Sequence, residues 1–172
     1  EKIRKMHFLH ILSIVRYSLY ENPQLKWIII YSAVIGVSTL TMAWFVQPYF
    51  KHVDLELSLF GVFWTMLNLS VAVTSYIAYK VEYRLGQKRM IVLTALSLPF
   101  LYLLLSQIHV VWGIGILFLF YLMRGLATPV LKDYINRLTE SNTRATVLSV
   151  RAFMIRGIFS IVGPLLGWYT DH

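Results

Sequence analysis

Five long apolar stretches, separated by short runs of charged and turn-forming residues, make up most of this 172-residue chain. A helix that crosses a bilayer core of about 30 Å needs about 20 predominantly apolar residues. The stretches that meet this requirement are 27–48, 57–79, 90–106, 110–130 and 147–169. Because backbone in lipid must satisfy its own hydrogen bonds, the pattern predicts an all-α, polytopic membrane protein with five transmembrane helices.

No lysine, arginine, aspartate or glutamate separates the third span from the fourth. The stretch 90–123 has His109 as its one titratable acid or base of this kind, and its 34 residues would form about 51 Å of helix. That length is too great for one crossing. A tight turn is therefore expected at Ser106-Gln107-Ile108-His109.

Composition agrees with a membrane protein. Apolar residues make up 58% of the chain and charged residues 14%, and the mean hydropathy is +0.63, whereas a soluble domain carries about 25% charged residues. The net charge of +8 does not indicate a nucleic-acid partner, because the basic residues punctuate apolar segments and form no stripe. The chain has no cysteine, which excludes disulfides and thiolate metal sites.

The lysines and arginines predict the orientation of the spans. An alternating path places fifteen of the sixteen on one side of the membrane, and only Lys51 falls on the other. Cytoplasmic loops carry the excess of lysine and arginine. The N-terminus and the loops 80–89 and 131–146 are therefore expected to be cytoplasmic, in a multi-pass protein of the cell membrane.

Residues 1–25 precede the first span and are predicted to form an amphipathic segment on the cytoplasmic face of the membrane. Asn22-Pro23 is expected to end this segment before the five-helix bundle of residues 26–172. His7 and His10 stand three residues apart, a spacing that metal ligands can have. No carboxylate or third ligand lies near them in the sequence, so no metal site is expected.

Polar and small residues recur within three spans at the spacing of one helix face. These stripes are Ser32, Gly36, Thr39, Ala43 and Gln47 in the first span, Gly61, Thr65, Asn68, Ala72 and Ser75 in the second, and Arg156, Ser160, Gly163 and Gly167 in the fifth. Such stripes face other helices or an aqueous cavity rather than lipid. Close packing is one interpretation and a cavity lining is the other. The candidate substrate-cavity residues are Gln47, Asn68, Arg124 and Arg156.

The two arginines favour the cavity. Arg156 lies 12 residues after Arg144, about 18 Å along a helix and near the bilayer midplane. Arg124 lies eight residues before Lys132, about 12 Å deep, where snorkelling to the interface is the alternative. Intramembrane charges usually face a cavity and carry function. The spans hold no acid to pair with them, so an anionic ligand or another part of the protein is expected to do so. Arg151 is shallower, and snorkelling or a loop contact is expected there.

Proline and glycine predict bending and close packing in the last two spans. Pro129 lies at the cytoplasmic end of the fourth span, and Gly163, Pro164 and Gly167 lie in the fifth. Proline removes a backbone hydrogen bond, and glycine lets neighbouring helices approach. Bent helices suit a protein that moves.

The order of these features resembles the second half of a major facilitator superfamily transporter. The run Ala78-Tyr-Lys-Val-Glu82-Tyr-Arg-Leu-Gly86-Gln-Lys88-Arg89 looks like the family's cytoplasmic loop signature. Ala78 stands where the family has glycine, Glu82 where it has aspartate, and one more residue separates the acid from Gly86. The later run Gly163-Pro164-x-x-Gly167 is similar to the glycine-proline motif of antiporters in the family.

The resemblance spans nearly the whole chain and implies that the five spans correspond to helices seven to eleven of a twelve-helix transporter. The chain is then a fragment of a secondary active transporter, five helices of a six-helix half. The N-terminal half and the last helix would be further partners. Such a protein moves a small molecule, with or without a coupling ion, by alternating access. The segment from Ala78 to Arg89 would act as a conformational loop in which Glu82 biases the open states.

A small five-span membrane scaffold or assembly protein without transport activity is the alternative. A full reading frame that continues beyond both ends would favour the transporter. An enzyme is not expected, because the spans hold no Ser–His pair, carboxylate dyad or metal cluster. No cofactor is expected either.

Overall fold

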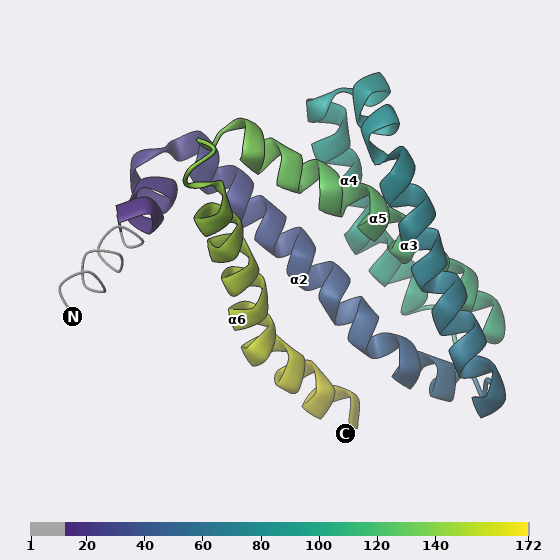
Figure 1. Cartoon of the computed structure of the whole chain (residues 1–172). Helices are drawn as coiled ribbons and strands as arrows, with labels where there is room; N and C mark the ends of the chain where they lie inside the picture. Colours follow the sequence, from purple (N-terminus) through teal and green to yellow (C-terminus); the bar gives the residue numbers. More distant parts are fainter. Residues whose placement is uncertain (1–12, 172) are drawn as a thin grey trace. The chain divides into compact units, whose positions relative to one another are not determined.

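The computed structural model describes residues 13–171, and in that part it contains five long helices and two short helical segments (Figure 1). The long helices are α2 (Pro23–His52), α3 (Leu57–Leu85), α4 (Gln87–Leu105), α5 (Ile114–Arg137) and α6 (Arg144–Asp171), and the short ones are the π-helix η1 (Tyr17–Glu21) and the 3₁₀-helix η2 (Val111–Gly113). Five helical segments are long and apolar enough to cross a membrane. The predicted all-α, polytopic fold is confirmed.

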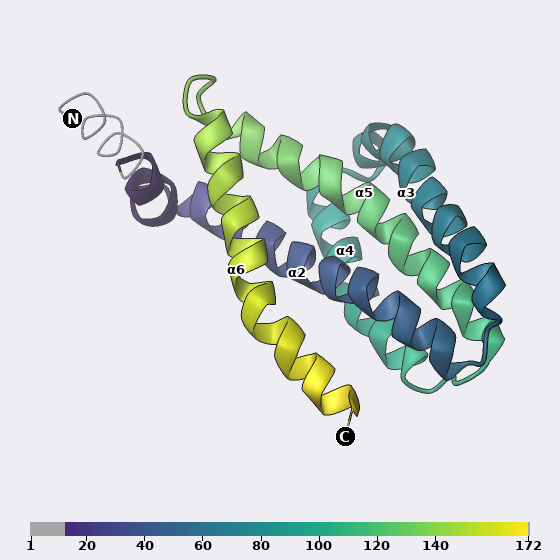
Figure 2. The ribbon, with the colours of Figure 1, turned by 60° about the horizontal axis from the view of Figure 1, so that its bottom comes forward.

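The chain divides into two compact units, and α2 and α5 run through both. Unit 1 comprises residues up to 37 and from 131 onward, and so holds the first half of α2, the end of α5 and α6. Unit 2 comprises residues 38–130 and holds the rest of α2, α3, α4 and most of α5. Figures 1 and 2 both show α3, α4 and the first turns of α5 gathered together in unit 2.

Within unit 2, α3 and α5 cross closely at Gly125. A Cβ atom on Gly125 would overlap Thr74 Oγ1 and would lie 2.7 Å from the carbonyl oxygen of Val71. The Ser75 hydroxyl donates a hydrogen bond to the Gly125 carbonyl oxygen at 3.1 Å. Small residues at such crossings let helix backbones approach in a membrane, and this crossing requires glycine.

Two tyrosines join α2 to α4 and to the α4–α5 turn. The Tyr102 hydroxyl donates to the Ser38 carbonyl oxygen at 2.7 Å, and its ring meets Phe120 edge-on with centroids 4.7 Å apart. The Tyr49 hydroxyl donates to the Ile108 carbonyl oxygen at 2.9 Å and also lies 3.3 Å from the Val110 carbonyl oxygen. The predicted turn at residues 106–109 is confirmed, and Tyr49 fixes its position against α2.

The helix ends extend beyond the predicted spans, and the connection expected at 80–89 is shorter than predicted. The helix α3 continues to Leu85, α4 begins at Gln87, and only Gly86 separates them. Lysine and arginine are good helix formers, so charged residues can end an apolar stretch without ending the helix. It ends at Gly86, whose φ of 78° and ψ of 158° lie in a region that is essentially restricted to glycine.

The loop expected at 131–146 is shorter for the same reason. The helix α5 continues through Lys132 to Arg137, and α6 begins at Arg144, which leaves residues 138–143 as the connection. An ion pair between Arg137 and Asp133, with 2.6 Å between the charged atoms, spans one turn at the end of α5. Pairs at this spacing support a helix that has left the bilayer.

The break predicted at Asn22-Pro23 is confirmed. Asn22 is extended, its side-chain oxygen accepts a hydrogen bond from the Leu25 N–H at 3.1 Å, and Pro23 is the first residue of α2. Asparagine as a cap and proline in the first position are typical of a helix start. His7 and His10, with the rest of residues 1–12, lie outside the described residues.

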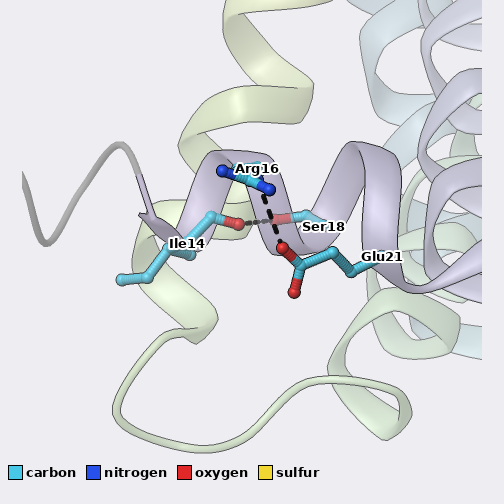
Figure 3. Close-up of polar contacts among 4 residues, drawn as sticks. All are labelled: Ile14, Arg16, Ser18 and Glu21. Atoms are coloured by element: carbon cyan, nitrogen blue, oxygen red, sulfur yellow. Dashed lines mark hydrogen bonds and ion pairs between the residues drawn. The ribbon is translucent and has the colours of Figure 1, made fainter.

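The segment before α2 is a short helical stretch that ends in the π-helix η1 (Figure 3). The buried Ser18 hydroxyl donates to the Ile14 carbonyl oxygen, and Arg16 pairs with Glu21 at 3.3 Å. Both members of the ion pair are largely exposed. Buried and charged positions share this segment, and the amphipathic, membrane-facing character predicted for residues 1–25 stays a prediction.

Candidate functional site

The helix α3 presents three faces that differ in burial and chemistry. The buried face consists of Leu67, Thr74 and Ala78. The polar face consists of Gly61, Thr65, Asn68 and Ala72, and the apolar face of Val62, Met66, Leu69 and Val73; all eight of these residues are exposed. At about 100° of rotation per residue, the polar face is centred about 100° from the apolar face and about 130° from the buried face.

The polar side chains of this face are bonded within their own helix. The Asn68 amide nitrogen donates to the Trp64 carbonyl oxygen at 2.8 Å, and the Thr65 hydroxyl donates to the Gly61 carbonyl oxygen at 2.8 Å. These bonds leave the Asn68 side-chain oxygen as an acceptor, and no partner from residues 13–171 reaches it. A hydrogen-bond donor from water, from a ligand or from another helix would complete the site.

The polar face of α3 meets α5 next to a candidate arginine. Ser75, which continues the line of Asn68 two turns along the helix, donates to Gly125, and Arg124 is the adjacent residue of α5. Arg124 is half-buried, and its guanidinium carbon lies 6.0 Å from the centroid of the Tyr121 ring. The Tyr121 hydroxyl is buried and has no hydrogen-bond partner among residues 13–171, although buried polar groups normally have one.

Ser32 and Gly36, the first two residues of the first-span stripe, are used for packing in unit 1. Arg151 of α6 is only 7% exposed, and its Nε donates a hydrogen bond to the hydroxyl of the fully buried Ser32 of α2. One turn further along both helices, the Ile155 side chain fills the space beside Gly36, where a Cβ would overlap it. Since both contacts advance in the same direction, α6 runs parallel to the first half of α2, as a five-span path requires (Figure 1).

The expectation that Arg151 snorkels or contacts a loop was wrong. Depth alone suggested an interfacial position, but the residue lies on the α6 face that meets α2. Its partner Ser32 is neutral, and no acid in the described part of the chain pairs with Arg151. The pair was missed because a contact between residues 119 positions apart cannot be found from one helix. The sequence offered one signal: Ser32 and Gly36 are four residues apart, and so are Arg151 and Ile155.

Arg156 lies on the other side of α6. Five residues of helix place it about 140° from Arg151, and it is exposed together with Ser160, while Gly163 and Gly167 of the same stripe are half-buried. The Arg156 side chain has no hydrogen bond or ion pair within residues 13–171. Arg156 belongs to unit 1, whereas Gln47, Asn68 and Arg124 belong to unit 2. Gln47 is exposed near the end of α2.

The residues expected to form the conformational loop lie at the corner between α3 and α4. Ala78 is fully buried within α3. Glu82 is half-buried, and its carbonyl oxygen accepts a hydrogen bond from the Gly86 N–H at 2.8 Å. Lys88 and Arg89 are exposed in the first turn of α4. The motif therefore forms a corner between two helices, with Gly86 as the one residue between them, and its role as a conformational loop stays a prediction.

The predicted bending residues lie inside continuous helices. Pro129 is half-buried in α5, and Pro164 is exposed in α6 between the half-buried Gly163 and Gly167. Neither proline interrupts its helix. Within residues 13–171, no group of three or more histidine, cysteine, aspartate or glutamate side chains is placed to hold a metal ion.

Comparisons of the chain with protein-family models, with curated proteins and with solved structures found no match. The resemblance to the major facilitator superfamily therefore stays a prediction from the sequence. What is established is a multi-pass, all-α membrane protein with polar faces on two of its spanning helices.

Proposed function

We propose that this chain forms five spans of a secondary transporter that moves a small molecule across the cell membrane by alternating access. The polar face of α3 is the observation that carries the proposal. It is exposed along about three turns and leaves the Asn68 side-chain oxygen unpaired within the described chain, whereas the adjacent apolar face suits lipid. Unpaired polar groups in hydrocarbon cost several kcal/mol, so an aqueous cavity is the better environment for this face.

The charges support a substrate class. Arg156 is exposed without a partner in the described chain, and Arg124 is half-buried against an aromatic ring. Intramembrane arginines of this kind normally face a cavity and are compensated by an anionic group. A small molecule with an anionic group would provide that compensation. Further helices of the same transporter would face the α6 stripe across the cavity.

The helix ends support an orientation with the N-terminus in the cytoplasm. The α3–α4 corner and the α5–α6 connection are flanked by basic residues, namely Lys80, Arg84, Lys88, Arg89, Lys132, Arg137 and Arg144. The opposite ends carry only Lys51. The excess of basic residues belongs on the cytoplasmic side.

Single cysteines on α3 test the proposal, and the chain has no native cysteine to interfere. Asn68→Cys is expected to react much faster with a membrane-impermeant maleimide than Leu69→Cys, which lies about 100° away on the helix. Leu69 is the matched control because it is 61% exposed but apolar. The thiolate that reacts is formed in water and suppressed in apolar surroundings.

The comparison can be repeated on α6 with Ser160→Cys and Ile161→Cys, both at exposed positions. The faster rate is again expected at the polar position. Equal rates at both members of each pair would contradict an aqueous cavity. The stripes would then be helix-packing surfaces, as in a membrane scaffold.

A further inference from the structure

Two histidines that are far apart in the sequence meet at one end of unit 2. His52 is the last residue of α2, and His109 lies in the turn between α4 and α5. His52 Nε2 lies 3.1 Å from His109 Nδ1, and the two rings are nearly perpendicular, with an angle of 77° between their planes. Both side chains are exposed, so a solute can reach them.

The distance between these nitrogens suits a shared metal ion. Histidine binds Zn²⁺ through nitrogens at about 2.0–2.1 Å, so two nitrogens on one ion lie roughly 2.9–3.4 Å apart for angles between 90° and tetrahedral. The measured separation falls in this range. Imidazole is a preferred ligand for zinc, copper and nickel.

The tautomers open to the two neutral imidazoles allow such an ion to bind. In the hydrogen-bonded pair, one of the two facing nitrogens carries a proton and donates the hydrogen bond, and the other nitrogen accepts that bond. A neutral imidazole can carry its proton on either ring nitrogen. When the donor ring changes tautomer, both facing nitrogens become free to bind a cation, and the pair releases no proton.

Tyr49 holds the His109 segment in place. Its hydroxyl donates to the Ile108 carbonyl oxygen and lies close to the Val110 carbonyl oxygen, on either side of His109. Tyr49 is also on the last turn of α2, three residues before His52. A Cβ atom on Gly113 would overlap this hydroxyl, so glycine at that position leaves room for it. The backbone segments that carry the two imidazoles are therefore held next to each other.

We propose that His52 and His109 form a two-histidine site for a divalent transition metal of the zinc, nickel and copper class, with water completing the coordination. The bound ion would connect the end of α2 to the α4–α5 turn. The site does not depend on the proposed transport activity. In the proposed orientation it would face the outside of the cell.

The test is calorimetric titration of the detergent-solubilised, untagged protein with Zn²⁺. The expected result is one equivalent bound, with His52→Gln and His109→Gln each lowering the affinity at least about tenfold, since even the loss of outer-shell groups costs 10–100-fold. Tyr49→Phe keeps both ligands but removes the bond to the turn, and it is expected to lower the affinity about tenfold.

The matched control replaces the other three histidines, His7, His10 and His172, together by glutamine, and this variant is expected to bind Zn²⁺ as the original chain does. In this variant, the electron paramagnetic resonance spectrum of bound Cu²⁺ is expected to show coupling to two imidazole nitrogens. Unchanged Zn²⁺ affinity in His52→Gln and His109→Gln, loss of binding in the control variant, or coupling to fewer than two nitrogens would overturn the proposal.

Discussion

Alanine at Gly125 is expected to destabilise the protein by about 1–3 kcal/mol, the usual cost of forcing extra volume into a packed interior. The added methyl group would overlap the Thr74 hydroxyl and approach the Val71 carbonyl oxygen, which is backbone and cannot rotate away. The hydrogen bond from Ser75 to Gly125 would lengthen as the helices separate. Chemical unfolding in detergent micelles, followed by the fluorescence of the five tryptophans, measures the loss.

Gly115→Ala is the matched control, since it lies in the same helix and a Cβ atom there would meet nothing within 4 Å. Alanine is favoured over glycine in a helix by up to about 1 kcal/mol, so this variant is expected to be neutral or slightly stabilised. Equal unfolding free energies for the two variants would show that α3 and α5 do not cross at Gly125.

Ser32→Ala is expected to destabilise the protein by about 1.5–3 kcal/mol, because it removes the hydrogen bond of a charged and buried Arg151. Arg151→Met is expected to cost less, since serine can bond to its own helix backbone instead. The double variant is expected to be no less stable than Ser32→Ala, because replacing both partners by apolar groups can be nearly neutral.

The same unfolding measurement gives all three free energies and therefore the coupling between the two side chains. Arg156→Met is the control, because this exposed arginine has no partner in the described chain and its replacement is expected to change stability by at most about 0.5 kcal/mol. Strictly additive effects of Ser32→Ala and Arg151→Met would contradict the contact between α2 and α6.

The existence of the five helices could be predicted from the sequence because lipid leaves the backbone few alternatives. Their ends could not. Charges at Lys80 and Lys132 were interpreted as the ends of helices, but they mark the edge of the apolar environment. The helices continue until a residue such as Gly86 adopts a conformation that excludes further helix.

The faces of the helices could be predicted only in part. The spacing of Asn68 with its neighbours identified a polar stripe, and the structure places most of that stripe on an exposed face of α3. The spacing in α2 identified Ser32 equally well, but that residue is buried against Arg151. One helix alone does not show which face meets a neighbour, so packing and cavity lining give the same pattern.

Contacts between distant segments could not be predicted from the sequence. His52 and His109 are 57 residues apart, and neither lies in a motif. Their separation depends on the length of α2, on the turn after α4 and on Tyr49, and each of these is determined by packing rather than by local preference. For the same reason, the environment of Arg151 was predicted from its expected depth in the membrane, and depth does not specify which residues lie next to it.

The side of the membrane on which each connection lies is the most direct test of the five-span account. Single cysteines at the exposed positions Asp54, Gln87, Gln107 and Ser141 sample the four connections between the long helices. The account predicts that Asp54 and Gln107 react with an impermeant maleimide added outside intact cells. It predicts that Gln87 and Ser141 react only after the cytoplasmic face is exposed. Reaction of Asp54 and Gln87 from the same side would contradict it.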